Sequence, residues 1–296
     1  MSGPGRERSH GPEGPQIPGA PDGPQIPGAP DGPQIPGAPA PGADGPLMFV
    51  RYAYPPNSLG YCGPADFAAF REYAAAGVVD RGLVQLAQAF SGAWPYLELI
   101  AAGCGISDPL DRRVVEAYWV GNDLLDRVPV TALGDSMADR FRRQVGGKFQ
   151  FLAEGVLAGG VPHHSFHVFG VYPWVGLLGD DRKAKHALMV LDRCRIRWGK
   201  VTAVHGDQAA VESRPLCWDG RLLTLGEPAP EMARLALDGT VLARGIGPGD
   251  WVSLHWDWIC DRLTQRQLRA LRGYTRRHLD LVSNRVEHSG PVAVLG

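Results

Sequence analysis

Lysine and net charge are both scarce in this sequence. Only four of the 296 residues are lysine, and 30 basic residues stand against 31 acidic ones, so the formal net charge is −1. Proteins that hold nucleic acid through its phosphates carry an excess of lysine and arginine. The charge balance therefore gives no electrostatic reason to expect nucleic acid as a partner.

Long apolar runs are missing as well. No stretch approaches the roughly 20 consecutive apolar residues of a transmembrane helix, and the N-terminus lacks the basic-then-apolar layout of a secretory signal. The five cysteines are odd in number and widely scattered, which is not the pattern of a disulfide framework. We therefore expect a cytoplasmic protein without a membrane span.

Motifs of several familiar sites are also absent. The sequence contains no P-loop and no Gly-x-Gly-x-x-Gly turn, and no pair of carboxylates stands out. Cys104, Cys217 and Cys260 have no Cys-x-x-Cys partner, which argues against a zinc site at any of them.

The first 46 residues are dominated by a repeat. The unit Gly-Pro-Gln-Ile-Pro-Gly-Ala-Pro-Asp begins at Gly14, again at Gly23 and again at Gly32 before it decays. Proline and glycine at this density prevent helices and strand ladders, and one apolar side chain per repeat cannot offset chain entropy. Residues 1–46 are therefore predicted to form a disordered tail with polyproline II character.

A mainly helical domain is predicted over residues 47–191. Its helix signals are a first-turn Pro64 with an Ala-rich run ending at Gly77, a cap at Asp80 for a helix through Phe90, an Asp108-Pro109 start leading into Arg113–Val120, and a helical stretch over 135–151. Two later segments are less regular. Phe166–Tyr172 has the apolar content of a buried strand, and Lys183–Leu191 fits a helix or a strand.

Residues 192–285 have the pattern of a small OB-like β-barrel with a C-terminal helix. Alternation over Arg193–Trp198 and over Trp251–Trp258 indicates half-buried strands, and Gly206-Asp207 is a hairpin turn signal. Thr264-x-x-Gln267 is a capping box, flanked by Leu263 and Leu268, which can form a hydrophobic staple. The apolar stripe of the helix is Leu268, Leu271, Thr275, Leu279 and Val282. The predicted fold class is therefore α+β.

Two segments of this last domain carry a resemblance to a known family. They are Cys194-Arg-Ile-Arg-Trp-Gly-Lys-Val, followed by the Gly206-Asp207 turn, and Pro248-Gly-Asp-Trp-Val-Ser-Leu-His-Trp-Asp-Trp. In this order they resemble the HypC/HupF-type chaperones of [NiFe]-hydrogenase maturation. The resemblance implies an accessory protein, not an enzyme, whose partner is a hydrogenase large subunit or a maturation protein.

The resemblance also implies a cofactor site. Cys194 matches the family's thiolate ligand of an iron that carries cyanide and carbonyl groups, and His255 matches the family's strand histidine. A soft thiolate suits low-valent iron, and an imidazole can ligate or hydrogen-bond beside it. The neighbouring Arg193, Arg195 and Arg197 are expected to lower the pKa of the thiol.

A different function is suggested by Tyr61-Cys62-Gly63-Pro64. This phrase resembles the start of the nucleophile helix in papain-like and bacteriocin-processing cysteine peptidases, where the helix N-terminus activates the thiol. His167 and Asp192 are the candidates for the base and its orienting acid. The alternatives are therefore a thiol hydrolase using Cys62, His167 and Asp192, or an interaction module whose cysteines are all structural.

The densest group of histidines is His163-His164-x-x-His167. If this segment is a strand, His163 and His167 face the same side and could bind nickel or iron, while His164 faces away. The alternative is a loop with solvent-exposed histidines. For a metal held between the two domains, Cys62, His167 and Cys194 are the first combination to test.

Overall fold

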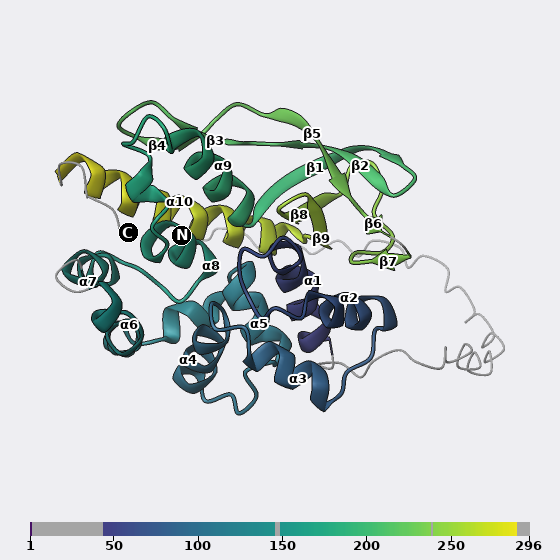
Figure 1. Cartoon of the computed structure of the whole chain (residues 1–296), viewed down its shortest axis with the longest axis horizontal. Coiled ribbons are helices and arrows are strands. Elements are labelled where there is room, and N and C mark those ends of the chain that lie inside the picture. Colours follow the sequence, from purple (N-terminus) through teal and green to yellow (C-terminus); the bar gives the residue numbers. More distant parts are fainter. Residues whose placement is uncertain (2–43, 146–148, 238, 289–296) are drawn as a thin grey trace. The chain divides into compact units, whose positions relative to one another are not determined.

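The computed structural model describes Met1, residues 44–145, 149–237 and 239–288, and the described residues from Asp44 onward belong to one compact unit (Figure 1). The predicted tail lies outside the described residues except at its end, where helix α1 already begins at Gly45. The fold is α+β, as predicted: helices come first, strands follow, and a long helix ends the described chain. No helix among the described residues is both long and apolar enough to cross a membrane.

Helices fill the described chain from Gly45 to Cys194. They are α1 (Gly45–Ser58), α2 (Phe67–Ala76), α3 (Arg81–Gln88), α4 (Trp94–Cys104), α5 (Arg112–Trp119), η1 (Asp123–Arg127), α6 (Val130–Val145), α7 (Phe149–Leu157), α8 (His164–Phe166), η3 (His167–Val171), η4 (Val175–Leu177) and α9 (Ala184–Cys194). The predicted domain boundary between residues 191 and 192 falls inside α9.

Helix starts follow the capping chemistry, with two shifts from the prediction. The Asp80 carboxylate accepts the backbone N–H of Leu83 at 2.9 Å, so the predicted cap of α3 is confirmed. The other two predicted starts, at Pro64 and at Asp108, are wrong. Helix α2 is capped by Asp66 instead of starting at Pro64, and α5 is capped by Asp111 instead of Asp108. In both places an aspartate two or three residues further along the chain makes the capping bond.

The predicted strand at Phe166–Tyr172 is wrong. The segment is helical: α8 runs directly into a π-helical turn, η3. Its apolar side chains are buried because α7, α9 and α10 pack around it. A short apolar run that is buried on all sides has no period that separates strand from helix. The segment Lys183–Leu191, for which both were open, is the helix α9.

The main sheet has the strand order β1-β2-β5-β9-β8, with β8 pairing back to β1. Its strands are β1 (Arg197–His205), β2 (Gln208–Ser213), β5 (Ala229–Arg234), β8 (Trp251–His255) and β9 (Trp258–Arg262). The β5–β9 junction is a single parallel pair, Arg234 with Trp258, so the barrel is barely joined at that seam. Two small hairpins are added, β3 (Leu216–Trp218) with β4 (Leu223–Leu225) and β6 (Ala236–Leu237) with β7 (Thr240–Val241).

Two details of the observed strands differ from the prediction. The Gly206-Asp207 turn between β1 and β2 is confirmed, but Trp251–Trp258 is a hairpin, β8 and β9, and not one strand. Cys194 does not lie on a strand, because it is the last residue of α9. The strand β1 begins three residues later, at Arg197.

The final helix α10 (Gln265–His288) has the predicted start. The Thr264 hydroxyl accepts the Gln267 N–H at 3.2 Å, and the Gln267 side chain accepts the Thr264 N–H at 2.9 Å, so the capping box is confirmed. The predicted stripe is buried throughout. It packs against α8, η3 and β4, which places α10 between the strands and the helices (Figure 1). One apolar core therefore contains residues from α1 to α5 and from β1, β9 and α10.

Candidate metal centre

Three buried side chains from distant parts of the chain converge in the core. They are His164 at the start of α8, Cys194 at the end of α9 and His255 at the end of β8. One potential ligand atom from each lies within 4.8 Å of those of the other two, and none of the residues is more than 3% exposed. A thiol and two imidazoles in this arrangement can hold a metal ion.

Backbone hydrogen bonds bring Cys194 beside His255. Strand β8 pairs with β1 so that Leu254 lies opposite Arg197. One residue beyond β8, the Trp256 N–H donates to the Arg193 carbonyl at 2.8 Å. The residue before Cys194 is therefore tied directly to the residue after His255.

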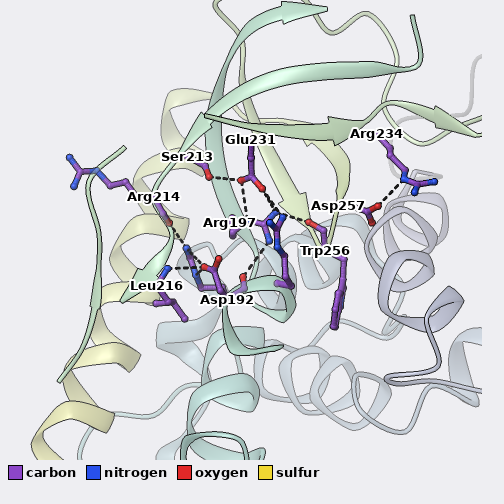
Figure 2. Close-up of polar contacts among 11 residues, drawn as sticks. Asp192, Arg197, Ser213, Arg214, Leu216, Glu231, Arg234, Trp256 and Asp257 are labelled. Carbon is purple, nitrogen blue, oxygen red and sulfur yellow. Dashed lines mark hydrogen bonds and ion pairs between the residues drawn. The ribbon is translucent and has the colours of Figure 1, made fainter. Parts of the chain in front are cut away.

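A network of charged side chains strengthens this connection (Figure 2). The guanidinium of Arg197 lies between Glu231 and Asp192: it contacts the Glu231 carboxylate at 3.0 Å and donates to the Asp192 carbonyl at 3.3 Å. It also donates to the Trp256 carbonyl at 2.6 Å, which holds the turn after β8. Arg195 pairs with the Asp192 carboxylate at 2.9 Å. Charges this deeply buried persist only when paired and fully hydrogen-bonded.

The network does not activate the thiol, so the expected lowering of the Cys194 pKa by arginines is wrong. Burial raises the pKa of Cys194 to about 12. Burial also lowers the pKa of Arg195 to about 10. The guanidinium groups of Arg195 and Arg197 pair with the carboxylates of Asp192 and Glu231 and not with the thiol. Cys194 is therefore a neutral thiol until something displaces its proton.

Hydrogen bonding fixes the tautomer of His255. Its Nδ1 lies 2.6 Å from the Tyr52 carbonyl, which can only accept, so Nδ1 carries the hydrogen. The lone pair is then on Nε2, and this buried atom has no hydrogen-bond partner among the described residues. Desolvation holds the pKa of His255 well below its usual value, so the ring is neutral.

His164 is fixed by the same logic. Its Nε2 lies 2.9 Å from the Cys194 carbonyl and must donate, which leaves the lone pair on Nδ1. The Tyr118 hydroxyl is 3.2 Å from Nδ1, but it also lies 3.3 Å from the Gly92 carbonyl and can donate there instead. Burial lowers the pKa of His164 to about 4. Both rings thus offer a lone pair and anchor the other nitrogen on a carbonyl, which is how metal-ligating histidines are usually held.

His163 and His167, the other predicted metal ligands, point elsewhere. His163 Nδ1 lies 2.7 Å from the Ser165 hydroxyl, and that hydroxyl lies 2.6 Å from Nδ1 of His278. His167 Nδ1 lies 3.1 Å from the Tyr96 hydroxyl. The expectation that His163 and His167 share a face while His164 points away is wrong, because it assumed a strand. The expectation of solvent-exposed histidines is wrong too, since all three are buried.

The residues of the thiol hydrolase hypothesis have separate polar partners. Cys62 lies in the loop between α1 and α2, four residues before the cap of α2, and burial raises the pKa of its thiol well above the usual value. His167 faces Tyr96, and the Asp192 carboxylate accepts from Arg195 and from the Leu216 N–H at 2.9 Å. The hydrogen bonds of the described residues do not join these groups into a relay.

Comparison with known proteins gives a family and no function. No curated protein matches the chain, and no solved structure matches it. Residues 41–289 match the family described as a family of unknown function, DUF6390. Since this match covers the α1–α10 fold and all three residues of the candidate centre, the chain belongs to the DUF6390 family.

Proposed function

We propose that this protein is a metal-binding accessory protein that holds a transition-metal ion, or a metal fragment, through His164, Cys194 and His255. The observation that carries the proposal is the convergence of these side chains from α8, α9 and β8. Sulfur and imidazole ligands together suit zinc, iron and nickel better than magnesium or calcium.

The burial of the three groups supports a binding role. A buried polar atom without a partner costs free energy, and Nε2 of His255 has no partner in the part of the chain that the structure describes. A bound cation would use that lone pair and would compensate the thiolate charge in the dry core. A substrate has no access to side chains that are at most 3% exposed, whereas a metal ion needs only its ligands.

The resemblance of the two C-terminal segments extends the proposal to iron and to hydrogenase assembly. This extension rests on those segments alone. It predicts that the purified protein binds a hydrogenase large subunit or a hydrogenase maturation protein, and that Cys194→Ser reduces transfer of iron to it. Failure to recover any such protein from cells that make hydrogenase would contradict the extension and leave metal binding to be judged separately.

Metal binding is tested by titrating the purified full chain with Zn²⁺ or Co²⁺ and by measuring bound metal per chain. The wild type is expected to bind one ion. Cys194→Ser and His255→Gln should each weaken binding by about tenfold or more, since each removes a direct ligand. Cys104→Ser is the matched control, because Cys104 is also buried but lies in α4, where its thiol contacts the Leu124 carbonyl at 3.4 Å. Equal binding by the wild type and both ligand variants would refute the proposal.

A further inference from the structure

We infer that the loop Gly60–Pro64 closes the metal centre and that Cys62, on this loop, supplies a fourth ligand. The inference rests on the proposed function. It gives a set of two thiolates and two imidazoles from Cys62, Cys194, His164 and His255. The loop is the segment that joins α1 to α2.

Contacts of the loop place it against the turn that follows His255. The Tyr61 ring stacks on the Trp256 ring with 4.2 Å between centroids. The Asn57 side chain donates to the Cys62 carbonyl at 3.0 Å, which fixes the inner end of the loop. Cys62 directly follows Tyr61, and the proposed ligand His255 directly precedes Trp256. The stack therefore holds the backbone of Cys62 near that of His255.

The environment of the Cys62 thiol points in the same direction. A hydrogen bond links it with Tyr172, and charge on Cys194 opposes charge on Cys62. The Tyr172 ring in turn packs on His167, with 4.6 Å between centroids. Thiolates in a desolvated core repel each other unless a cation compensates their charge.

The coordination chemistry leaves a place for this thiol. Three protein ligands fill three corners of a tetrahedron, and a stable, closed site needs a fourth. Cys62 is not within 4.8 Å of all three members of the group, so the loop must move inward to complete the site. Of the other cysteines, Cys104 lies in α4, Cys217 is exposed on β3 and Cys260 is buried in β9.

The inner side of the loop is held by Asn57, whose side-chain amide donates to the Cys62 and Pro64 carbonyls at 3.0 and 2.6 Å, and its outer side is exposed. Tyr61 is 37% exposed and Leu59 is 52% exposed. Trp256, on which Tyr61 stacks, has φ of 54°, which is a costly backbone conformation for a bulky side chain. The indole N–H of Trp256 has no partner among the described residues. The stack of Tyr61 on Trp256 is the contact that an inward movement of the loop must change.

This arrangement explains how a buried site would exchange its metal. Cys194 is buried, whereas Cys62 is only partly so, and Cys62 is the ligand that an incoming ion meets first. On binding, a divalent ion gives up its water ligands, and each thiol releases one proton to solvent as its sulfur–metal bond forms. No atom changes oxidation state.

The test is the near-ultraviolet charge-transfer absorbance of the Co²⁺-loaded full chain, which reports the number of thiolate ligands. Cys62→Ser is expected to lower the absorbance per bound Co²⁺ to about half, since one of two sulfur ligands is lost. Cys217→Ser, which removes an exposed thiol, should leave it unchanged. Unchanged absorbance in Cys62→Ser would overturn the inference.

Alkylation of the wild type checks the same point without a substitution. Iodoacetamide should modify Cys62 slowly in the metal-free chain, because burial raises the pKa of its thiol, and bound Co²⁺ or Zn²⁺ should slow the modification further. Equal modification with and without metal would count against the inference. The two proposals fail separately: retained binding in Cys194→Ser and His255→Gln sinks the metal centre, while lost binding there with no effect of Cys62→Ser sinks only the fourth ligand.

Discussion

Mild acid should unfold the metal-free protein. Among the described residues five histidines are buried, and desolvation holds the pKa of each of them below the usual value, to about 3 for His163 and about 4 for His164. The unfolded chain binds a proton at each of these rings near pH 6.5, and the folded chain does not. The stability that this provides is complete above that pH and is lost as the pH falls towards the folded values.

The size of the effect follows from the number of rings. Between pH 7 and pH 5.5, each histidine that is protonated only in the unfolded chain lowers the free energy of unfolding by about 1.3 kcal/mol. The five rings together lower it by about 6 kcal/mol, which is comparable to the whole stability of many domains, about 5–15 kcal/mol. The slope should grow as the pH falls through 6.5 and be largest about one unit below it, where each ring of the unfolded chain is almost fully protonated.

Urea unfolding of the chelator-treated protein at four values between pH 7 and pH 5.5, at constant ionic strength, measures this loss. The midpoint should fall with each step. His205→Asn is the matched control, because His205 is exposed at the end of β1. A midpoint that stays constant over this range would show that the rings take up protons in the folded state, and the argument from burial would be wrong.

Three further predictions concern the Arg197 contacts, the Thr264 cap and the protons released when metal binds. Arg197→Met leaves Arg193 as the remaining arginine partner of Glu231 and removes the donor to the Asp192 and Trp256 carbonyls, so it should cost about 3 kcal/mol in urea unfolding. Arg197→Lys should not restore the lost stability, because an ammonium group cannot reproduce the forked contacts. Thr264→Ala removes the capping hydroxyl of α10 and should cost about 1 kcal/mol in the same assay. Zn²⁺ binding measured by calorimetry in buffers of different ionisation enthalpy should release about two protons in the wild type and about one in Cys62→Ser, since burial raises the pKa of both Cys62 and Cys194.

Features decided by neighbouring residues were predictable from the sequence. The capping box at Thr264 and Gln267 and the Gly206-Asp207 turn need only a few residues of context, and both are confirmed. The burial of Arg197 could not be predicted in this way. It depends on Glu231, which is 34 residues further along the chain and reaches Arg197 through the pairing of β2 with β5 and of β1 with β2.

The candidate centre was only partly predictable, for the same reason. Cys194 and His255 were paired through the family resemblance, and the structure places them together. His164 was missed because its segment was interpreted as a strand. The i, i+3 spacing of His164 and His167 puts both rings on one side of a helix, 6.4 Å apart between centroids, but it does not indicate Cys194 or His255 as neighbours of His164. Choosing between helix and strand required the packing of α10 and α9 around this segment, which no local pattern contains.

Acid sensitivity and metal binding in this core arise from different groups. His164 is neutral down to about pH 4, so near neutrality a metal does not compete with protons for the imidazole lone pairs. The protons that it must displace are on the thiols, where burial holds the pKa of Cys194 at about 12. The stabilisation by bound metal should therefore shrink as the pH falls, in addition to the loss caused by the histidines. Without metal, this core is stable only above the pH at which the histidines of the unfolded chain become protonated. The thiols also give up their protons to a metal most readily at that higher pH.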